Sequence, residues 1–147
     1  METTLRHDYA PFMVERGKIR EFAQAIGLEE CIYYSVESAW EKGFRDIVAP
    51  PTFGTVIDFW NSHDYYQFFE KLDLDPENVL HGEQSYDYIE DICAGDTISG
   101  NVRVRSIKEK GNKKFYYFET FYSNQDKKQV MIGRATLVVL GRKEKQV

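Results

Sequence analysis

Residues 80–88 read Leu80-His81-Gly82-Glu83-Gln84-Ser85-Tyr86-Asp87-Tyr88, and the rest of the chain is organised around this stretch. It places one of the three histidines of the chain beside a carboxylate and an amide. The alternation that follows predicts a β-strand with His81 and Glu83 on one face and Gly82 and Gln84 on the other. Gly82 could also permit a close backbone approach or a bulge. His81 is therefore the sharpest functional candidate, and the alternative is a packed histidine that bonds to backbone groups.

The second half of the chain is a series of strands, of which residues 79–88 are the first. Residues 97–109, 113–124 and 129–141 have the same strand-like composition, with turn sequences at 94–96, 111–112 and 124–127. The first half is mainly helical: apolar residues recur at spacings of three and four in residues 18–26, and residues 36–42 read as a short helix with Ser35 as its N-cap. The order predicts helices first and an antiparallel meander after them.

A nearly continuous apolar run follows the consecutive prolines Pro50 and Pro51. The residue before a proline avoids the helical region, whereas Pro51 itself fits the first turn of a helix. From Pro51 to about Trp60 the sequence is apolar on nearly every side, which predicts a buried helix. Such a helix needs a curved sheet around it. The sequence thus predicts an α+β fold, in which a bent antiparallel sheet wraps around a central buried helix, with residues 1–147 as a single domain.

The composition argues against several classes of function. The 147 residues carry a formal net charge of −5 and no basic stripe, which argues against a nucleic-acid partner. No segment approaches the ~20 apolar residues of a membrane span, and residues 1–4 contain no apolar signal region. We therefore expect a cytoplasmic protein without a membrane partner. Cys31 and Cys93 lack metal-ligand spacing and indicate reduced thiols, so we expect neither a metal nor a cofactor.

Several motifs along nearly the whole chain resemble the MaoC-like dehydratase superfamily, and in particular its N-terminal, FAS1-like dehydratase domain. Residues 16–23 (RGKIREFA) resemble the opening of that domain, and residues 43–53 (GFRDIVAPPTF) resemble the segment that leads into its central helix. Another motif is formed by residues 80–84, a following strand and residues 94–97 (AGDT). The turn at 124–126 and the closing strand at 134–139 also match.

The resemblance implies a hot-dog fold, in which the sheet wraps a long helix, and it implies that such units pair. It further implies that acyl thioesters of coenzyme A or of acyl-carrier protein bind along the pair interface. In this chemistry, backbone N–H groups at the start of the central helix polarise the thioester carbonyl. The expected substrate-binding residues at the start of this helix are therefore Thr52 and Gly54, although Thr52 could simply cap the helix. On the strand expected to line the site, they are His81, Gly82 and Gln84.

Active hydratases of this superfamily carry Asp-x-Asn-Pro-φ-His before the central helix, and this chain departs from that motif. Removing a proton beside a thioester carbonyl and expelling a β-hydroxyl require a positioned base and acid. Aligned on Ile32, the histidine position holds Tyr33 and the aspartate position holds Leu28. Glu29 or Glu30 could substitute only after a shift of register. A tyrosine with a pKa near 10 is a poor base at neutral pH.

The departure resembles the non-catalytic half of two-part dehydratases. We expect a subunit of a (3R)-hydroxyacyl-thioester dehydratase or enoyl-thioester hydratase, whose Asp/His pair comes from a catalytic hot-dog partner; a homodimer is the competing assembly. His81 and Tyr33 remain candidates for a catalytic role. One alternative function is a non-enzymatic acyl-coenzyme A or acyl-carrier-protein binder. Another is a hot-dog acyl-coenzyme A thioesterase, for which Asp46 and Asp58 are the nearest carboxylates.

Overall fold

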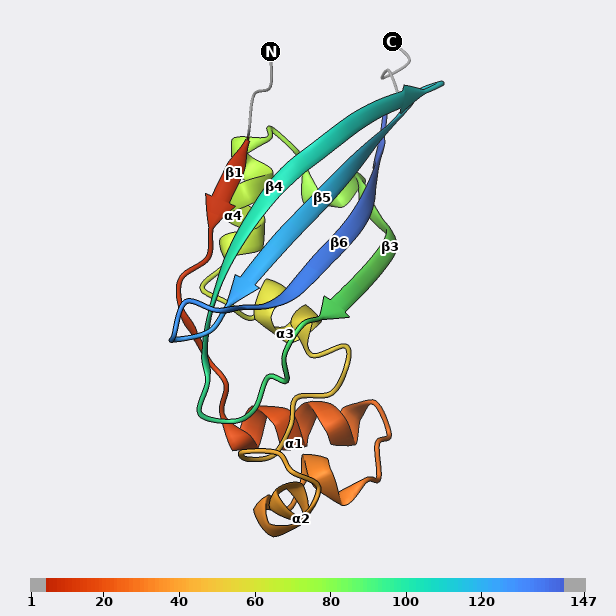
Figure 1. Ribbon diagram of the computed structural model, residues 1–147. Helices are drawn as coiled ribbons and strands as arrows, with labels where there is room; N and C mark the ends of the chain where they lie inside the picture. Colours follow the sequence, from red (N-terminus) through yellow and green to blue (C-terminus); the bar gives the residue numbers. More distant parts are fainter. Residues whose placement is uncertain (1–4, 142–147) are drawn as a thin grey trace.

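A computed structural model describes residues 5–141, and in it a bent antiparallel sheet is covered on one face by helices (Figure 1). Residues 1–4, on which the expectation of no signal region rests, lie outside the described residues. The elements in chain order are β1 (Arg6–Asp8), β2 (Phe12–Met13), α1 (Arg16–Ala25), η1 (Cys31–Tyr33), α2 (Val36–Glu41), α3 (Gly54–Phe59), α4 (Asp64–Lys71), η2 (Pro76–Asn78), β3 (Val79–Tyr88), β4 (Thr97–Lys110), β5 (Lys113–Ser123) and β6 (Gln129–Leu140).

The four long strands confirm the strand predictions to within one residue at each end. Buried side chains alternate with more exposed ones along parts of β4, β5 and β6, and Gly111 takes the positive φ of 64° that the turn between β4 and β5 requires. The strand order is β1-β4-β5-β6-β3, and every neighbouring pair is antiparallel. Strand β3 therefore forms one edge of the sheet, and most of its residues are exposed.

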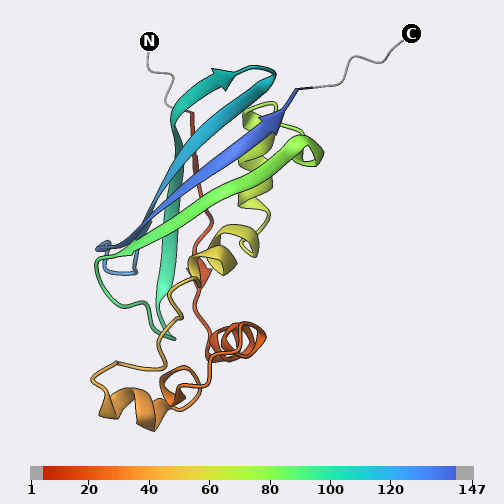
Figure 2. The ribbon, with the colours of Figure 1, turned by 90° about the vertical axis from the view of Figure 1, so that its right-hand side faces the viewer.

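The inner face of the sheet and the helices α3 and α4 form the core. Figure 2 shows both helices lying along the same face of the sheet. The largest fully buried side chains come from both layers: Phe53, Ile57 and Phe68 from the helical side, and Ile98, Val102, Tyr122, Met131 and Leu137 from the strands. This burial supplies the main favourable free energy of the fold. The α+β arrangement with a buried helix against a bent sheet is thus confirmed.

The central helix is shorter than the sequence predicted. It begins at Gly54 and not at Pro51, because residues 51–53 form a turn, whereas its last residue, Phe59, is close to the predicted end. The chain then turns through Ser62 and His63, whose φ angles are 43° and 61°. The left-handed region cannot continue a right-handed helix, so a separate helix, α4, begins at Asp64. Thr52 does not cap α3: the N-cap position is Phe53, without a side-chain hydrogen bond. By contrast, Ser35 caps α2 as predicted, because its hydroxyl accepts a bond from the amide of Ser38 at 3.3 Å.

His7, which the sequence does not single out, joins the first strand to α4. It is buried, and its Nε2 lies 2.8 Å from Asp64 Oδ1. Its Nδ1 lies 2.7 Å from Lys71 Nζ, so the ammonium donates to Nδ1 and the ring hydrogen on Nε2 is donated to the carboxylate. A buried imidazole is tolerated here because both nitrogens have partners.

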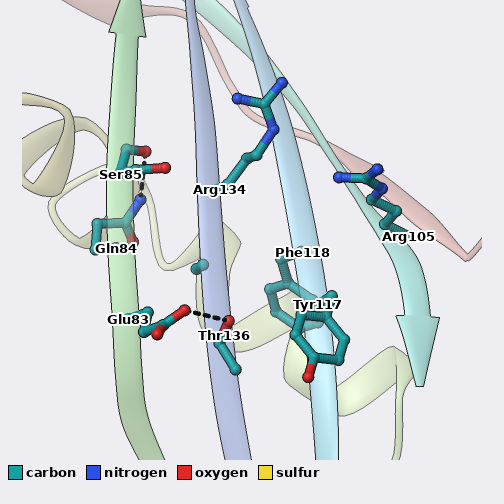
Figure 3. A pocket seen from close by; sticks show the side chains of 9 residues that line it. Glu83, Gln84, Ser85, Arg105, Tyr117, Phe118, Arg134 and Thr136 are labelled. Carbon is teal, nitrogen blue, oxygen red and sulfur yellow. Dashed lines mark hydrogen bonds between the residues drawn. The ribbon is translucent and has the colours of Figure 1, made fainter. Parts of the chain in front are cut away.

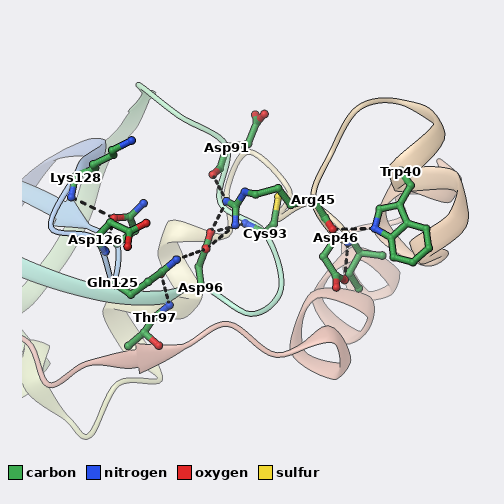
Figure 4. A network of polar contacts seen from close by, with 12 residues as sticks. Trp40, Arg45, Asp46, Asp91, Cys93, Asp96, Thr97, Gln125, Asp126 and Lys128 are labelled. Carbon is green, nitrogen blue, oxygen red and sulfur yellow. Dashed lines mark hydrogen bonds and ion pairs between the residues drawn. The ribbon is translucent and has the colours of Figure 1, made fainter.

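A polar network holds the loop before the central helix to the end of the sheet (Figure 4). Asp96 is buried, and its two carboxylate oxygens accept bonds from the guanidinium of Arg45 at 2.9 and 3.0 Å. The amide of Cys93 and the side chain of Gln125 donate to the same carboxylate at 3.0 and 3.1 Å. Burial alone would raise the pKa of Asp96, but these hydrogen bonds hold it below its ordinary value.

Replacing Asp96 with alanine is expected to lower the free energy of unfolding by about 2 kcal/mol, because three donors lose their acceptor. The lowered pKa means that the carboxylate stabilises the fold at neutral pH and loses this effect as the pH falls through its folded-state pKa, below about 4. Urea denaturation at neutral and acidic pH measures both effects. Asp126→Ala, at an exposed turn position, is the control and is expected to change stability by less than about 0.5 kcal/mol. An equal effect of the two substitutions would contradict the assigned role of Asp96.

Candidate functional site

Strand β3 carries a bulge at Gly82, which separates the residues that the sequence placed together. His81 pairs with Leu137 and Glu83 with Thr136, so one residue of β3 is left over between them. The predicted common face of His81 and Glu83 is therefore wrong. Instead, His81 Nε2 lies 3.1 Å from Gln84 Oε1, while Glu83 accepts a bond from the Thr136 hydroxyl at 3.4 Å. The bulge that Gly82 could permit is confirmed.

An open groove of about 510 Å³ lies beside the middle of β3, across the sheet (Figure 3). Glu83, Gln84 and Ser85 form one side of it, and Arg134 from β6 and Arg105 from β4 reach toward it. Arg134 is already engaged, because it donates to Asp87 at 2.5 Å and to Glu119 at 3.3 Å. Of the predicted binding residues, Gln84 lines this groove, and His81 does not.

A smaller pocket of about 190 Å³ lies at the C-terminal end of β3 and is lined in part by Tyr33. The 3-10 turn η1 places Tyr33 there, and the end of β3 supplies Tyr88, whose hydroxyl donates to the carbonyl of Pro50 at 3.2 Å. Asp91 follows the strand and completes the polar part of the lining. The remaining lining residues are apolar or proline: Ile32, Phe44, Val48, Ala49, Pro51 and Ile92. We call this the Tyr33 pocket.

The tyrosines of the Tyr33 pocket can donate hydrogen bonds, but they cannot serve as bases at neutral pH. Burial, followed by the charge of Glu30, raises the pKa of Tyr33. Burial, followed by Tyr33 and Asp91, raises the pKa of Tyr88 well above its ordinary value. Asp91 is the one carboxylate in the lining, and no histidine is part of it. His81 lies seven positions earlier on the same extended strand, on the order of 20 Å away.

Glu29 and Glu30, which could replace the missing catalytic groups after a shift of register, do not reach the Tyr33 pocket. Both are exposed and border a separate surface depression with Gly27 and Leu28. Sequence reasoning also missed Tyr88 and Asp91, because only folding brings the end of β3 against η1. Val48 links the two segments: its amide donates to the carbonyl of Ile32 in η1 at 3.2 Å, and it forms an antiparallel bridge with Cys93 beyond the end of β3. The amide of Ala49 adds a 2.8 Å bond to the carbonyl of Ile92.

The start of α3 is packed against strand β3. Thr52 is exposed, whereas Gly54 is buried beneath the ring of Tyr86, and Thr55 Oγ1 lies 3.3 Å from the Tyr86 hydroxyl. None of the predicted binding residues Thr52, Gly54, His81, Gly82 and Gln84 lines the Tyr33 pocket, and only Gln84 lines the groove beside β3.

The two carboxylates considered for thioester hydrolysis are both engaged. Asp46 accepts two bonds from Arg16, at 3.0 and 2.8 Å, and one from the amide of Ile47 at 2.8 Å. Asp58 is buried and accepts hydrogen bonds from three tyrosine hydroxyls. Neither lines the Tyr33 pocket or the groove beside β3.

Residues 5–141 contain no group of three His, Cys, Asp or Glu side chains placed to hold a metal ion. No helix within them has the length and apolar character needed to cross a membrane.

Comparison with known proteins gives a consistent result. Residues 3–133 match the family model described as the FAS1-like dehydratase domain region. The UPF0336 protein of Leifsonia xyli subsp. xyli is 33% identical over 137 residues, which are 89% of this chain and 87% of that protein. The UPF0336 protein of Saccharopolyspora erythraea is 31% identical over 146 residues, covering 97% of this chain and 93% of that protein.

Solved structures show the same fold. A chain of the C-terminally truncated HadBC (3R-hydroxyacyl-ACP dehydratase) complex from Mycobacterium tuberculosis superposes with a TM-score of 0.83 at 25% identity, over 92% of this chain and 95% of that one. A chain of the ChsH1-ChsH2 complex from the same organism gives 0.72 at 18% identity, over 91% and 89%. A MaoC-like dehydratase from Rhodospirillum rubrum gives 0.73 at 18% identity, over 97% and 95%. The expected hot-dog fold is confirmed.

Proposed function

Because this chain belongs to the FAS1-like dehydratase domain family, we propose that it is the acyl-thioester-binding, non-catalytic subunit of a (3R)-hydroxyacyl-thioester dehydratase or enoyl-thioester hydratase. Its partner is a second hot-dog subunit that carries the Asp/His pair. The acyl group is delivered as a thioester of coenzyme A or of acyl-carrier protein.

The make-up of the Tyr33 pocket carries this proposal. In the alignment on Ile32, Tyr33 takes the position of the motif histidine and Leu28 that of the aspartate. Hydration of an enoyl thioester needs a base that activates water and an acid that protonates the α-carbon. The Tyr33 pocket offers tyrosines with raised pKa values and one exposed carboxylate, Asp91, but no imidazole. Its mainly apolar lining suits the acyl chain better than the reacting atoms.

The free edge of β3 supports an assembly with a second subunit. Ten residues of β3 expose their outer edge, and an uncovered edge of this length invites pairing with another strand. Large apolar side chains flank it: Leu80 and Ile89 are each 54% exposed, and Trp60 is 80% exposed next to Phe59, whose ring lies 6.3 Å from that of His81. The HadBC and ChsH1-ChsH2 structures are both two-component complexes, which favours a heterodimer over a homodimer.

Substitutions of Tyr33 test whether the Tyr33 pocket binds the acyl group. Tyr33→Ala removes one wall and is expected to weaken binding of a non-hydrolysable crotonyl-coenzyme A thioether by about tenfold. Tyr33→Phe keeps the wall and loses only the hydroxyl, so binding should stay within about twofold. Isothermal titration calorimetry on the assembled complex measures both. Equal losses for the two variants would assign the hydroxyl a direct role, and unchanged binding by Tyr33→Ala would place the acyl group elsewhere.

The same titration, together with a hydration assay of crotonyl-coenzyme A, separates the enzyme subunit from a non-enzymatic binder. Thioether binding together with turnover in the complex supports the dehydratase assignment. Binding without turnover in any assembly would support a pure acyl-thioester carrier, and absence of binding would remove both.

A further inference from the structure

Asp58, near the end of α3, is the centre of a buried cluster of tyrosines. The carboxylate is 3% exposed and accepts bonds from the hydroxyl of Tyr9 at 3.2 Å, from that of Tyr86 at 3.1 Å, and from that of Tyr122. These tyrosines come from the segment after β1, from the edge strand β3 and from β5, respectively. A fourth ring, Tyr65 of α4, faces the same carboxylate. We call Asp58, Tyr9, Tyr86 and Tyr122 the Asp58 cluster.

Three glycines make room for the Asp58 cluster. A Cβ atom at Gly54 would lie 2.3 Å from the ring of Tyr86, and one at Gly100 would lie 2.5 Å from the ring of Tyr9. A Cβ atom at Gly133 would lie 3.1 Å from the ring of Tyr122. Each of the three tyrosine rings that bond to Asp58 therefore lies against a glycine, where a larger side chain would clash with the ring. The Asp58 cluster thus depends on residues from several segments that are distant in the sequence.

Stability does not explain a carboxylate at this place. Among residues 5–141, no lysine, arginine or histidine nitrogen lies within ion-pair distance of Asp58. Burial raises the pKa of Asp58 to about 6, although the hydrogen bonds from Tyr122, Tyr86 and Tyr9 oppose the rise. A neutral group of the same shape would avoid the cost of burying the charge. A buried carboxyl group whose pKa is raised by desolvation is a candidate for a functional role.

Tyr86 connects the cluster to the edge of the sheet. It lies in the middle of β3, and its hydroxyl is also 3.3 Å from Thr55 Oγ1 in the first turn of α3. An ionised Asp58 accepts all three tyrosine hydrogens. A protonated Asp58 must donate its own hydrogen to a tyrosine oxygen, so one tyrosine has to turn its hydrogen away. Tyr86 can then accept from the protonated Asp58 and donate to Thr55, so the charge-assisted bond that held it to the carboxylate is replaced by a weaker neutral one.

We propose that Asp58 is a positioning residue that fixes edge strand β3 to helix α3 when it is ionised and loosens β3 when it is protonated. The consequence for acyl binding and subunit pairing rests on the proposed function, in which β3 ends at the Tyr33 pocket and offers the pairing edge. The titratable groups facing Asp58 are Tyr9, Tyr65, Tyr86 and Tyr122, all neutral in this range, so the response belongs to the carboxyl group.

Two effects of opposite sign distinguish this role from a merely structural one. Because the folded-state pKa of Asp58 is raised, protonation favours the folded state, and its contribution to global stability is present below about pH 4 and lost as the pH rises through about 6. The proposal demands that β3 loosen locally over the same interval in which this contribution grows. A residue that only stabilised the fold would move local and global stability together.

Hydrogen exchange of the purified chain tests the proposal. Protection factors, corrected for intrinsic exchange rates, are compared near pH 5 and near pH 7.5 for amides of β3 and, as an internal reference, for residues 101–104 of β4. In the wild type, β3 amides around Tyr86 are expected to lose about tenfold in protection at the lower pH relative to β4, as for one hydrogen bond. Asp58→Asn and Tyr86→Phe should each abolish the difference. Tyr122→Phe, which deletes a bond to the same carboxylate from another strand, should retain it.

A β3 protection that is equal at both pH values in the wild type would overturn the proposal. So would a pH difference that persists in Asp58→Asn, or one that Tyr122→Phe removes as completely as Tyr86→Phe does. No acyl thioester or partner is present in this measurement. A chain that fails the thioether titration but shows the pH response would keep the positioning role and lose only the proposed function.

Discussion

Replacing Gly54 with alanine is expected to lower the free energy of unfolding by about 3 kcal/mol, although it adds only a methyl group. The new Cβ atom would lie 2.3 Å from the Tyr86 ring, which cannot move freely because its hydroxyl bonds to Asp58 and lies near Thr55. Relief of the clash must displace either β3 or α3. The loss should exceed the gain of about 1 kcal/mol that alanine offers over glycine within a helix.

Gly17→Ala is the matched control for this substitution. Gly17 also lies in a helix, α1, and a Cβ atom there would have no neighbour within 4 Å. It is therefore expected to raise stability by about 0.5 kcal/mol through the helix propensity of alanine. Urea denaturation followed by circular dichroism gives both values. A Gly54→Ala protein as stable as Gly17→Ala would show that α3 and β3 are not packed in the way described.

The isolated chain is expected to hydrate crotonyl-coenzyme A at least about a thousandfold more slowly than an assembly that contains an Asp/His pair, because general acid–base catalysis supplies rate factors of this size. The reason is local: the Tyr33 pocket holds no histidine, and its tyrosines have raised pKa values. Loss of absorbance of the enoyl thioester measures the rate.

His81→Ala is the control that addresses the remaining histidine candidate on β3. His81 bonds to Gln84 and lies outside the Tyr33 pocket, so its removal should leave the rate of the assembled complex within about threefold of wild type. Robust hydration by the chain alone, lost on His81→Ala, would show instead that His81 is catalytic.

Local patterns in the sequence predicted the strands well. Strand β3 has the predicted bounds, because alternation and the flanking turn residues are local properties that the fold did not override. The face assignment within it was wrong, because a single bulge at Gly82 reverses the alternation, and which residue slips depends on the pairing with β6. The apolar run after Pro51 indicated burial of the helix but not its first residue, because residues 51–53 form a turn and the helix begins at Gly54.

The candidate site was predictable only where a motif marked it. The position of Tyr33 followed from the motif, but Tyr88 and Asp91 join it through a contact between η1 and the end of β3. The partners of Asp58 could not be predicted either, since Tyr9 and Tyr122 are 49 and 64 residues away along the chain. Such contacts depend on tertiary packing, which the local periodicity of the sequence does not reveal.

The central claim is that this chain binds the acyl thioester while a partner performs the chemistry. The most direct test is an enoyl-thioester hydration assay on an equimolar mixture with a hot-dog chain that contains Asp-x-Asn-Pro-φ-His, carried out with wild-type chain and with Tyr33→Ala. We expect activity only in the mixture. Replacing the histidine of the partner should abolish this activity, Tyr33→Ala should reduce it, and Tyr33→Phe should remain active. Full activity of this chain without the partner, or an active mixture that is insensitive to Tyr33→Ala, would contradict it.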